Sequence, residues 1–123
     1  MKFQLLSTAL ITGLIVFNSC KKDSTDYASQ ATCTGTTPTY TNEIADILNS
    51  RCAMSGCHSA SSAQEGINLS TYASASNQFL TNDDNLIAIH HGSGVKAMPD
   101  GEPQMDATTI NKLDCWVKNG CPQ

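Results

Sequence analysis

The sequence contains one stretch of unusual chemistry, Cys52-Ala53-Met54-Ser55-Gly56-Cys57-His58. It holds two cysteines, and a histidine follows the second one directly. This order is typical of covalent haem attachment, in which both thiols form thioethers with the haem vinyl groups and the adjacent imidazole binds the iron. The usual spacing is C-x-x-C-H, whereas here it is C-x4-C-H, two residues longer. The stretch therefore predicts a haem site made by Cys52, Cys57 and His58.

Residues 1–19 have the features of a bacterial lipoprotein signal peptide. Lys2 supplies the positive charge near the N-terminus, and residues 5–17 form an apolar stretch that is too short to span a bilayer. The stretch ends in Ser19-Cys20, a small residue followed by a cysteine, as in a lipobox. We expect cleavage before Cys20 and lipidation of Cys20, which would anchor the mature protein in the bacterial cell envelope, facing the periplasm or the cell surface. An ordinary secretory signal is the alternative.

The expected mature chain is short and acidic. Cleavage after residue 19 would leave 104 of the 123 residues, enough for one small domain. Of the seven Lys and Arg residues, Lys2 leaves with the signal, so six face eleven Asp and Glu, a net charge of −5. This balance argues against nucleic acid as a partner and is compatible with a partner that presents a basic patch.

The mature chain divides into two parts. Residues 20–39 are rich in Ser, Thr and charged side chains, and we expect them to form a lipidated flexible tether. Residues 40–123 form the domain, whose apolar content is low outside two helical stripes. Domains of this size often need a disulfide, a metal or a cofactor for stability, and a haem would supply the missing apolar core.

Helical patterns predict an all-α domain. A first helix is expected over about residues 41–52, capped by Thr41 or Asn42, and a last helix over about residues 106–119, capped by Asp106. Apolar stripes of the kind that face a core run along both: Ile44, Ile47 and Leu48 in the first, and Ile110, Leu113, Trp116 and Val117 in the last. A short helix is expected over residues 85–91 and a helical turn or loop over residues 77–84.

Met98 is the expected sixth ligand of a haem iron. It is followed by Pro99 and lies in a loop that begins with Gly92-Ser93-Gly94. A thioether in such a loop would bind the face of the iron opposite His58 and raise the reduction potential relative to two imidazoles. The rival ligands are His91, His90 and Met105, and the alternative role for Met98 is to fill a gap in the core.

The sequence resembles a known family over residues 40–121. The shared order is a helix, C-x(n)-C-H, a variable middle with Gly66-Ile67-Asn68-Leu69-Ser70-Thr71-Tyr72, a Met-Pro loop, and a last helix in which a Trp is followed by Asn-Gly. This order is similar to that of small c-type cytochromes, and closest to the cytochrome c-like domains of bacterial envelope lipoproteins.

The resemblance implies a cytochrome c-like fold, in which the N- and C-terminal helices of the domain cross beside one covalently bound haem c. It implies that Cys52 and Cys57 attach the haem, that His58 is the proximal ligand and that Met98 is the distal one. The implied function is electron transfer between redox protein partners. The sequence gives no catalytic constellation, so we expect neither an enzyme nor a small-molecule substrate.

The remaining cysteines allow one internal disulfide. With Cys20 assigned to lipid and two cysteines to haem, three are left: Cys33, Cys115 and Cys121. The family often has one cysteine before the domain and one just before the tryptophan of the last helix, so the resemblance implies a Cys33–Cys115 pair. Cys33–Cys121 and Cys115–Cys121 stay open as alternatives, and the family pattern gives no role for Cys121.

Two other functions fit the same residues. Cys52, Cys57, His58 and either His90 or His91 could bind a zinc ion, although adjacent cysteine and histidine side chains converge poorly on one tetrahedral ion. Alternatively, Cys52 and Cys57 form a disulfide in a stapled lipoprotein that has a binding role and no redox function.

Overall fold

The computed structural model describes residues 26–123, and these residues form helices joined by turns and loops, without strands. The all-α class predicted from the sequence is therefore confirmed for this part of the chain. The expected signal peptide, the lipidation site Cys20 and the beginning of the tether lie outside the described residues. Within residues 26–123, no helix has the length and apolar character needed to cross a membrane.

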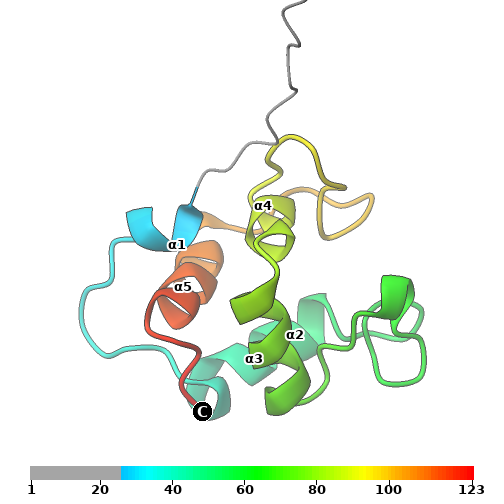
Figure 1. Cartoon of the computed structure of the whole chain (residues 1–123), viewed down its shortest axis with the longest axis horizontal. Coiled ribbons are helices and arrows are strands. Elements are labelled where there is room, and N and C mark those ends of the chain that lie inside the picture. Colours follow the sequence, from blue (N-terminus) through cyan, green and yellow to red (C-terminus); the bar gives the residue numbers. More distant parts are fainter. Residues whose placement is uncertain (1–25) are drawn as a thin grey trace, which may run out of the picture.

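The helices are short and follow one another closely along the chain (Figure 1). In order they are α1 (Tyr27–Gln30), a π-helical turn η1 (Tyr40–Ile44) that continues into α2 (Ala45–Arg51), a 3-10 turn η2 (Gln64–Gly66), α3 (Tyr72–Thr81), α4 (Asp84–Ile89) and α5 (Ala107–Lys118). The loop between α2 and α3 and the loop after α4 extend from the same side of the helices in this view. These two loops carry the residues to which the sequence analysis assigned the haem.

The two principal predicted helices are present, with small shifts in their ends. The first begins at Tyr40, because the hydroxyl of Thr39, and not Thr41 or Asn42, caps it by accepting a hydrogen bond from the Asn42 N–H. The last helix begins after Asp106, as predicted, and the Asp106 carboxylate accepts from the Thr109 N–H at 2.9 Å. Hydrogen bonding to Thr109 lowers the pKa of this carboxyl.

Helix α3 covers a region in which we expected only a turn or loop over residues 77–84. The Thr71 hydroxyl caps it by accepting from the Ser74 N–H, and the helix then runs for ten residues. Its buried side chains, Ala75 and Phe79, are four residues apart, and Tyr72 precedes Ala75 by three. This spacing puts all three on one face, so tertiary packing maintains a helix whose other positions are mostly Ser, Ala and Asn.

Trp116 lies at the centre of the core. Its side chain is fully buried, and its ring meets those of Tyr40 and Phe79 at centroid distances of 6.3 and 5.8 Å. The indole Nε1–H donates to the Pro122 carbonyl at 2.8 Å, so the polar atom of the buried ring is satisfied. Because η1 contacts α5, the first turn of the domain lies against its last helix.

The end of α5 gives Cys121 a structural role. The Gly120 N–H donates to the Val117 carbonyl and the Cys121 N–H donates to the Trp116 carbonyl, the bonding pattern of a Schellman motif. Gly120 takes the left-handed conformation that this motif requires, with φ of 78°. The residue that follows the glycine in such a motif commonly packs on the helix it terminates, and the Cys121 side chain is fully buried. Cys121 is therefore a small apolar core residue.

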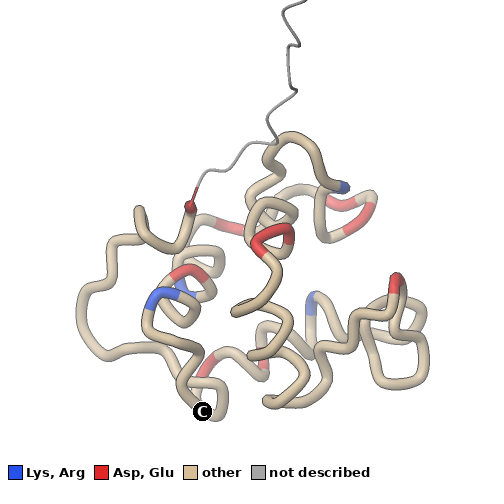
Figure 2. The backbone as a smooth tube through the Cα atoms, in the orientation of Figure 1, with Lys and Arg blue, Asp and Glu red and all other residues tan. Residues whose placement is uncertain are grey.

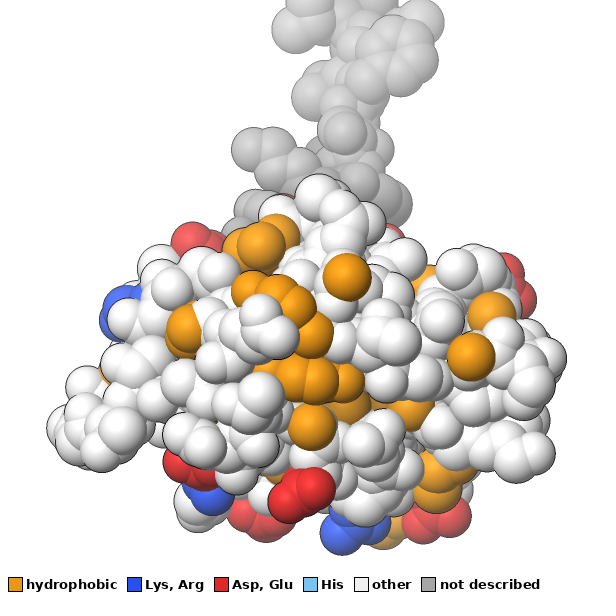
Figure 3. All heavy atoms as spheres, turned by 90° about the horizontal axis from the view of Figure 1, so that it is seen from below, with side chains coloured by type: hydrophobic (Ala, Val, Ile, Leu, Met, Phe, Trp, Pro, Cys, Tyr) orange, Lys and Arg blue, Asp and Glu red, His pale blue; other side chains and the backbone are white. Residues whose placement is uncertain are grey.

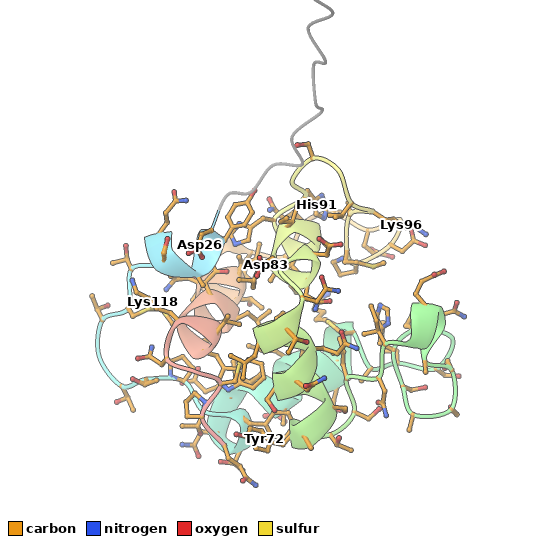
Figure 4. All side chains as sticks on the ribbon, in the orientation of Figure 1. Asp26, Tyr72, Asp83, His91, Lys96 and Lys118 are labelled. Carbon is orange, nitrogen blue, oxygen red and sulfur yellow. A yellow bond between two sulfur atoms is a disulfide. The ribbon has the colours of Figure 1, made fainter. Side chains whose placement is uncertain are left out.

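The segment before the domain is packed onto the domain. Ala28 in α1 is buried, Tyr27 stacks on His90 with ring centroids 3.8 Å apart, and Cys33 forms a disulfide with Cys115 of α5. The Lys118 ammonium also donates to the carbonyls of Ser29 and Ala31, as Figure 4 places it beside α1. This differs from the extended or disordered tether expected up to residue 39, because the order comes from contacts with α4 and α5.

Loss of the Cys33–Cys115 bond is expected to destabilise the fold. The bond joins residues 82 apart, and closing a loop of this length contributes about 3–5 kcal/mol in the chain-entropy model. We therefore expect Cys33→Ser, which leaves the buried Cys115 in place, to lower the free energy of unfolding in urea by that amount.

Unfolding in the presence of a reductant provides the control. Wild type and Cys33→Ser should then have the same free energy of unfolding, because both lack the bond. A difference below about 1 kcal/mol between the oxidised wild type and the variant would show that the bond adds little to stability.

Candidate functional site

The first cysteine of the motif is placed by the end of α2. The amides of Cys52 and Ala53 both donate to the Leu48 carbonyl, at 2.8 and 2.7 Å, so the helix ends at a defined residue. The Cys52 side chain is half-buried and packs against the hydrophobic core. The helix and the core together therefore fix the position of this thiol.

A compact turn joins Cys52 to Cys57 and His58. The Cys57 N–H donates to the Met54 carbonyl and the His58 N–H donates to the Cys52 carbonyl, both at 3.0 Å. Gly56 has φ of 80°, a left-handed conformation that favours glycine. The two residues added to the usual C-x-x-C-H spacing are accommodated in this turn.

His58 is oriented by a second, longer turn. Its Nδ1 lies 3.2 Å from the Ile67 carbonyl, and its own carbonyl accepts from the Leu69 N–H at 2.8 Å. A carbonyl oxygen only accepts, so Nδ1 carries the proton of this bond, and Nε2 of the neutral ring is left with a lone pair. This is the tautomer and the orientation that a metal-binding imidazole needs.

Cys52 and Cys57 are free thiols. The stapled-lipoprotein alternative required a disulfide between them, and the structure has none there. Burial raises the pKa of Cys52 to about 11, and the neighbouring Cys57 thiol adds to the effect, while Arg51 acts in the opposite direction. At neutral pH the Cys52 sulfur therefore stays protonated.

Met98 is held at both of its backbone polar groups. Its N–H donates to the Ala88 carbonyl at 3.0 Å, and its carbonyl accepts from His91 Nε2 at 3.1 Å. Its side chain is half-buried and packs against the core. The loop that carries the expected distal ligand is thus tied to the C-terminal end of α4.

The rival ligands are engaged elsewhere. His90 Nε2 lies 2.9 Å from both carboxylate oxygens of the buried Asp114, and Met105 is buried in the core. His91 is exposed, and its Nε2 contacts the Met98 carbonyl. Burial raises the pKa of the Asp114 carboxyl, and the hydrogen bond from His90 opposes this shift. Met105 is thus enclosed by the core and each of the two histidines has its Nε2 in a hydrogen bond, whereas the Met98 side chain is half-buried.

The zinc alternative lacks a ligand cluster. Among residues 26–123, no three His, Cys, Asp or Glu side chains lie close enough together to hold a metal ion. The fourth ligand that the alternative needs, His90 or His91, already binds Asp114 or the Met98 carbonyl. Haem ligation by His58 and Met98 does not require such a cluster, because the porphyrin supplies the other donors.

Different contacts therefore position the different residues of the predicted site. Cys52, Ile67 and Met98 pack against one hydrophobic core, and the amide and carbonyl contacts described above fix the turns that contain Cys57 and His58. Comparisons with protein-family models, with curated proteins and with solved structures found no match.

Two contacts that shape the site were absent from the sequence prediction. The Ile67 carbonyl has no sequence signal, because any residue can present a carbonyl. The sequence signal for the contact between His91 and Met98 is weak. It shows only that His91 follows a short helix, at a position where a left-handed residue is common.

The raised pKa of Cys52 predicts low reactivity of this thiol in the folded, haem-free protein. A shift from 9.0 to about 11 lowers the thiolate fraction near neutral pH about 100-fold. We expect iodoacetamide to alkylate Cys52 about 100-fold more slowly in the folded chain than in urea, with the rate rising as the pH approaches 11, as measured by peptide mass spectrometry.

The unfolded chain is the reference for this measurement. The variant Cys57→Ser keeps the burial that is the main cause of the shift, so Cys52 should remain protected in it. Equal alkylation rates in the folded and unfolded chains would contradict the buried position of the thiol.

Proposed function

We propose that this protein is a monohaem c-type cytochrome, anchored by lipid in the bacterial envelope, that carries single electrons between redox partners. The observation that carries the proposal is the contact between His58 Nδ1 and the Ile67 carbonyl. It fixes the ring next to Cys57 in the tautomer whose Nε2 binds a metal. A structural histidine could make the same bond, so the contact supports a metal ligand through its combination with the position of His58 directly after Cys57.

The donor set supports haem c in particular. Cys52 and Cys57 are free thiols, so each could add its S–H across one haem vinyl group, forming a C–S bond and placing the hydrogen on the other vinyl carbon. His58 would bind the iron through Nε2, and Met98 would complete the coordination from a loop fixed at both backbone groups. The haem would supply an iron that alternates between the ferrous and ferric states. A nitrogen and a thioether sulfur are ligands that favour this use over zinc binding.

The exposed apolar surface also supports the proposal. Half-buried hydrophobic side chains, Cys52, Ala53, Ile67 and Met98 among them, surround the buried core in the two loops that carry the proposed ligands. Met54 in the motif turn is 44% exposed. A band of hydrophobic side chains crosses the face shown in Figure 3. The half-buried apolar side chains of the two loops favour an apolar ligand, and the flat porphyrin of a haem would cover them.

The charge distribution supports a basic partner. Residues 26–123 contain ten Asp and Glu residues against four Lys and Arg residues, and the acidic positions are spread along the backbone in Figure 2. Two of the four cations are neutralised in ion pairs, Lys96 with Asp100 and Lys112 with Glu43. Transient redox complexes use small interfaces that are steered by charge, so a partner with a basic patch fits this surface.

The alternative is a disulfide-stapled lipoprotein without redox function. The Cys33–Cys115 bond is compatible with it, but the cytochrome resemblance implies the same bond, so this bond does not distinguish the two functions. It gives no role to the free thiols of Cys52 and Cys57 or to the orientation of His58.

Covalent haem and its ligands can be tested together. The full chain would be exported in cells that have cytochrome c maturation machinery, and the reduced-minus-oxidised visible spectrum recorded, with haem staining of denaturing gels. We expect haem to stay on the denatured chain, a low-spin spectrum in wild type, and loss of that spectrum in His58→Ala and Met98→Ala.

The matched controls separate attachment from ligation. Cys52→Ser and Cys57→Ser should each retain at most one thioether, whereas Cys121→Ala should retain the haem. A colourless wild-type protein would overturn the proposal and favour the stapled lipoprotein. An unchanged spectrum in Met98→Ala would transfer the sixth position to His91 or His90.

A further inference from the structure

The C-terminal ends of α4 and α5 have the same backbone pattern with different residues. After α4, the His91 N–H donates to the Ala88 carbonyl at 3.1 Å and the Gly92 N–H donates to the Ile87 carbonyl at 2.8 Å. After α5, Gly120 and Cys121 make the equivalent two bonds. Both ends are therefore Schellman motifs, in which the first residue after the cap has a left-handed backbone.

His91 occupies the position at which glycine is favoured. Its φ is 53°, whereas the matching residue of α5 is Gly120 with φ of 78°. A residue with a Cβ is mildly strained in this conformation, which Ala63, Glu65 and Cys121 also adopt in this protein. The His91 side chain makes a contact that offsets the strain, because Nε2 lies 3.1 Å from the Met98 carbonyl and donates to it.

Gly92, the residue after His91, is a glycine for a different reason. A Cβ on Gly92 would lie 2.8 Å from Ile87 Cγ2 and 2.8 Å from the hydroxyl of Tyr27, so only glycine fits there. The sequence thus places glycine at the crowded position and histidine at the strained one. Strain alone would favour glycine at residue 91 as well.

The backbone contacts of Met98 close the loop from His91 to Met98 onto the end of α4. The Ala88 carbonyl accepts from both His91 and Met98, and His91 in turn donates to the carbonyl of Met98. The loop between them, which includes Lys96 in Figure 4, is thereby closed on the end of α4. Loss of the imidazole would leave the Met98 carbonyl without this donor and the loop held by one backbone bond.

We propose that His91 is a positioning residue: it holds the Met98 loop so that the Met98 thioether stays on the iron. The inference rests on the proposed haem function and adds to it a residue that binds neither haem nor substrate. His91 acts through the Met98 carbonyl, and its strained backbone conformation is retained because glycine could not make this bond.

Two substitutions of one residue test the proposal in the haem-bound protein. His91→Gly removes the donor and suits the left-handed backbone, so relief of strain should offset much of the lost bond and the unfolding temperature should change little. His91→Gln keeps an N–H donor of similar reach but gains nothing in backbone preference. The readouts are the absorption band in the red that ferric haem shows with a methionine ligand, and the rate at which cyanide binds the ferric protein.

We expect His91→Gly to weaken the methionine band and to raise the cyanide binding rate about 2- to 10-fold, the factor that one ordinary hydrogen bond contributes to an equilibrium. His91→Gln should restore both values most of the way to wild type. The control Lys96→Ala breaks the exposed Lys96–Asp100 ion pair in the same loop and should change neither.

Each other outcome overturns the inference in a distinguishable way. If both His91 variants have the wild-type band and cyanide rate, His91 does not position Met98, while the haem function stands. If both variants lose the low-spin spectrum and Met98→Ala does not, His91 is itself the ligand. A wild-type chain without covalent haem overturns the proposed function and this inference together.

Discussion

The hydrogen bonds to the Pro122 carbonyl hold the two ends of the domain together. This oxygen accepts from Trp116 Nε1 at 2.8 Å and from the Tyr40 N–H at 2.9 Å, and a carbonyl has a lone pair for each. One donor belongs to the last helix and the other to the first turn of the domain. A buried indole N–H without a partner would cost about 1–3 kcal/mol. The chain therefore has to return to Trp116 after α5, and this return positions η1 and the α2 helix that leads to Cys52.

A second constraint comes from the N-terminal segment, which connects the ends of α4 and α5. Tyr27 stacks on His90 and places its hydroxyl against Gly92, while Cys33 is bonded to Cys115. His90 in turn binds the buried Asp114 of α5. The position of α4 relative to α5 therefore depends on residues that precede the domain. The proposed Met98 loop depends on it too, because that loop is bonded to the end of α4.

The sequence predicted the elements whose signals are local. Asp106 and the apolar stripe that follows it predicted the last helix. Gly120 carried an unused signal for Cys121, since the residue after such a glycine is commonly apolar and packed. Helix α3 was less predictable, because only Tyr72, Ala75 and Phe79 in a Ser- and Ala-rich run mark its buried face. The order of residues 26–33 had no local signal, since it depends on long-range contacts. The motif residues of the candidate site could be picked out from the sequence, but the backbone carbonyls that orient them could not.

Backbone hydrogen bonds, more than side-chain packing, order the two loops of the candidate site. The His58 turn is held through the amides of Cys57, His58 and Leu69, and the Met98 loop through Ala88 and His91. Their apolar side chains stay half-buried. Under the proposed function, haem would meet loops that are already ordered, so little conformational entropy would be lost on attachment. Burial of those side chains would then add to the stability of the fold, since a ligand that binds only the native state favours it. Under the same proposal, the cofactor would add apolar contact to a core that is built from short helices.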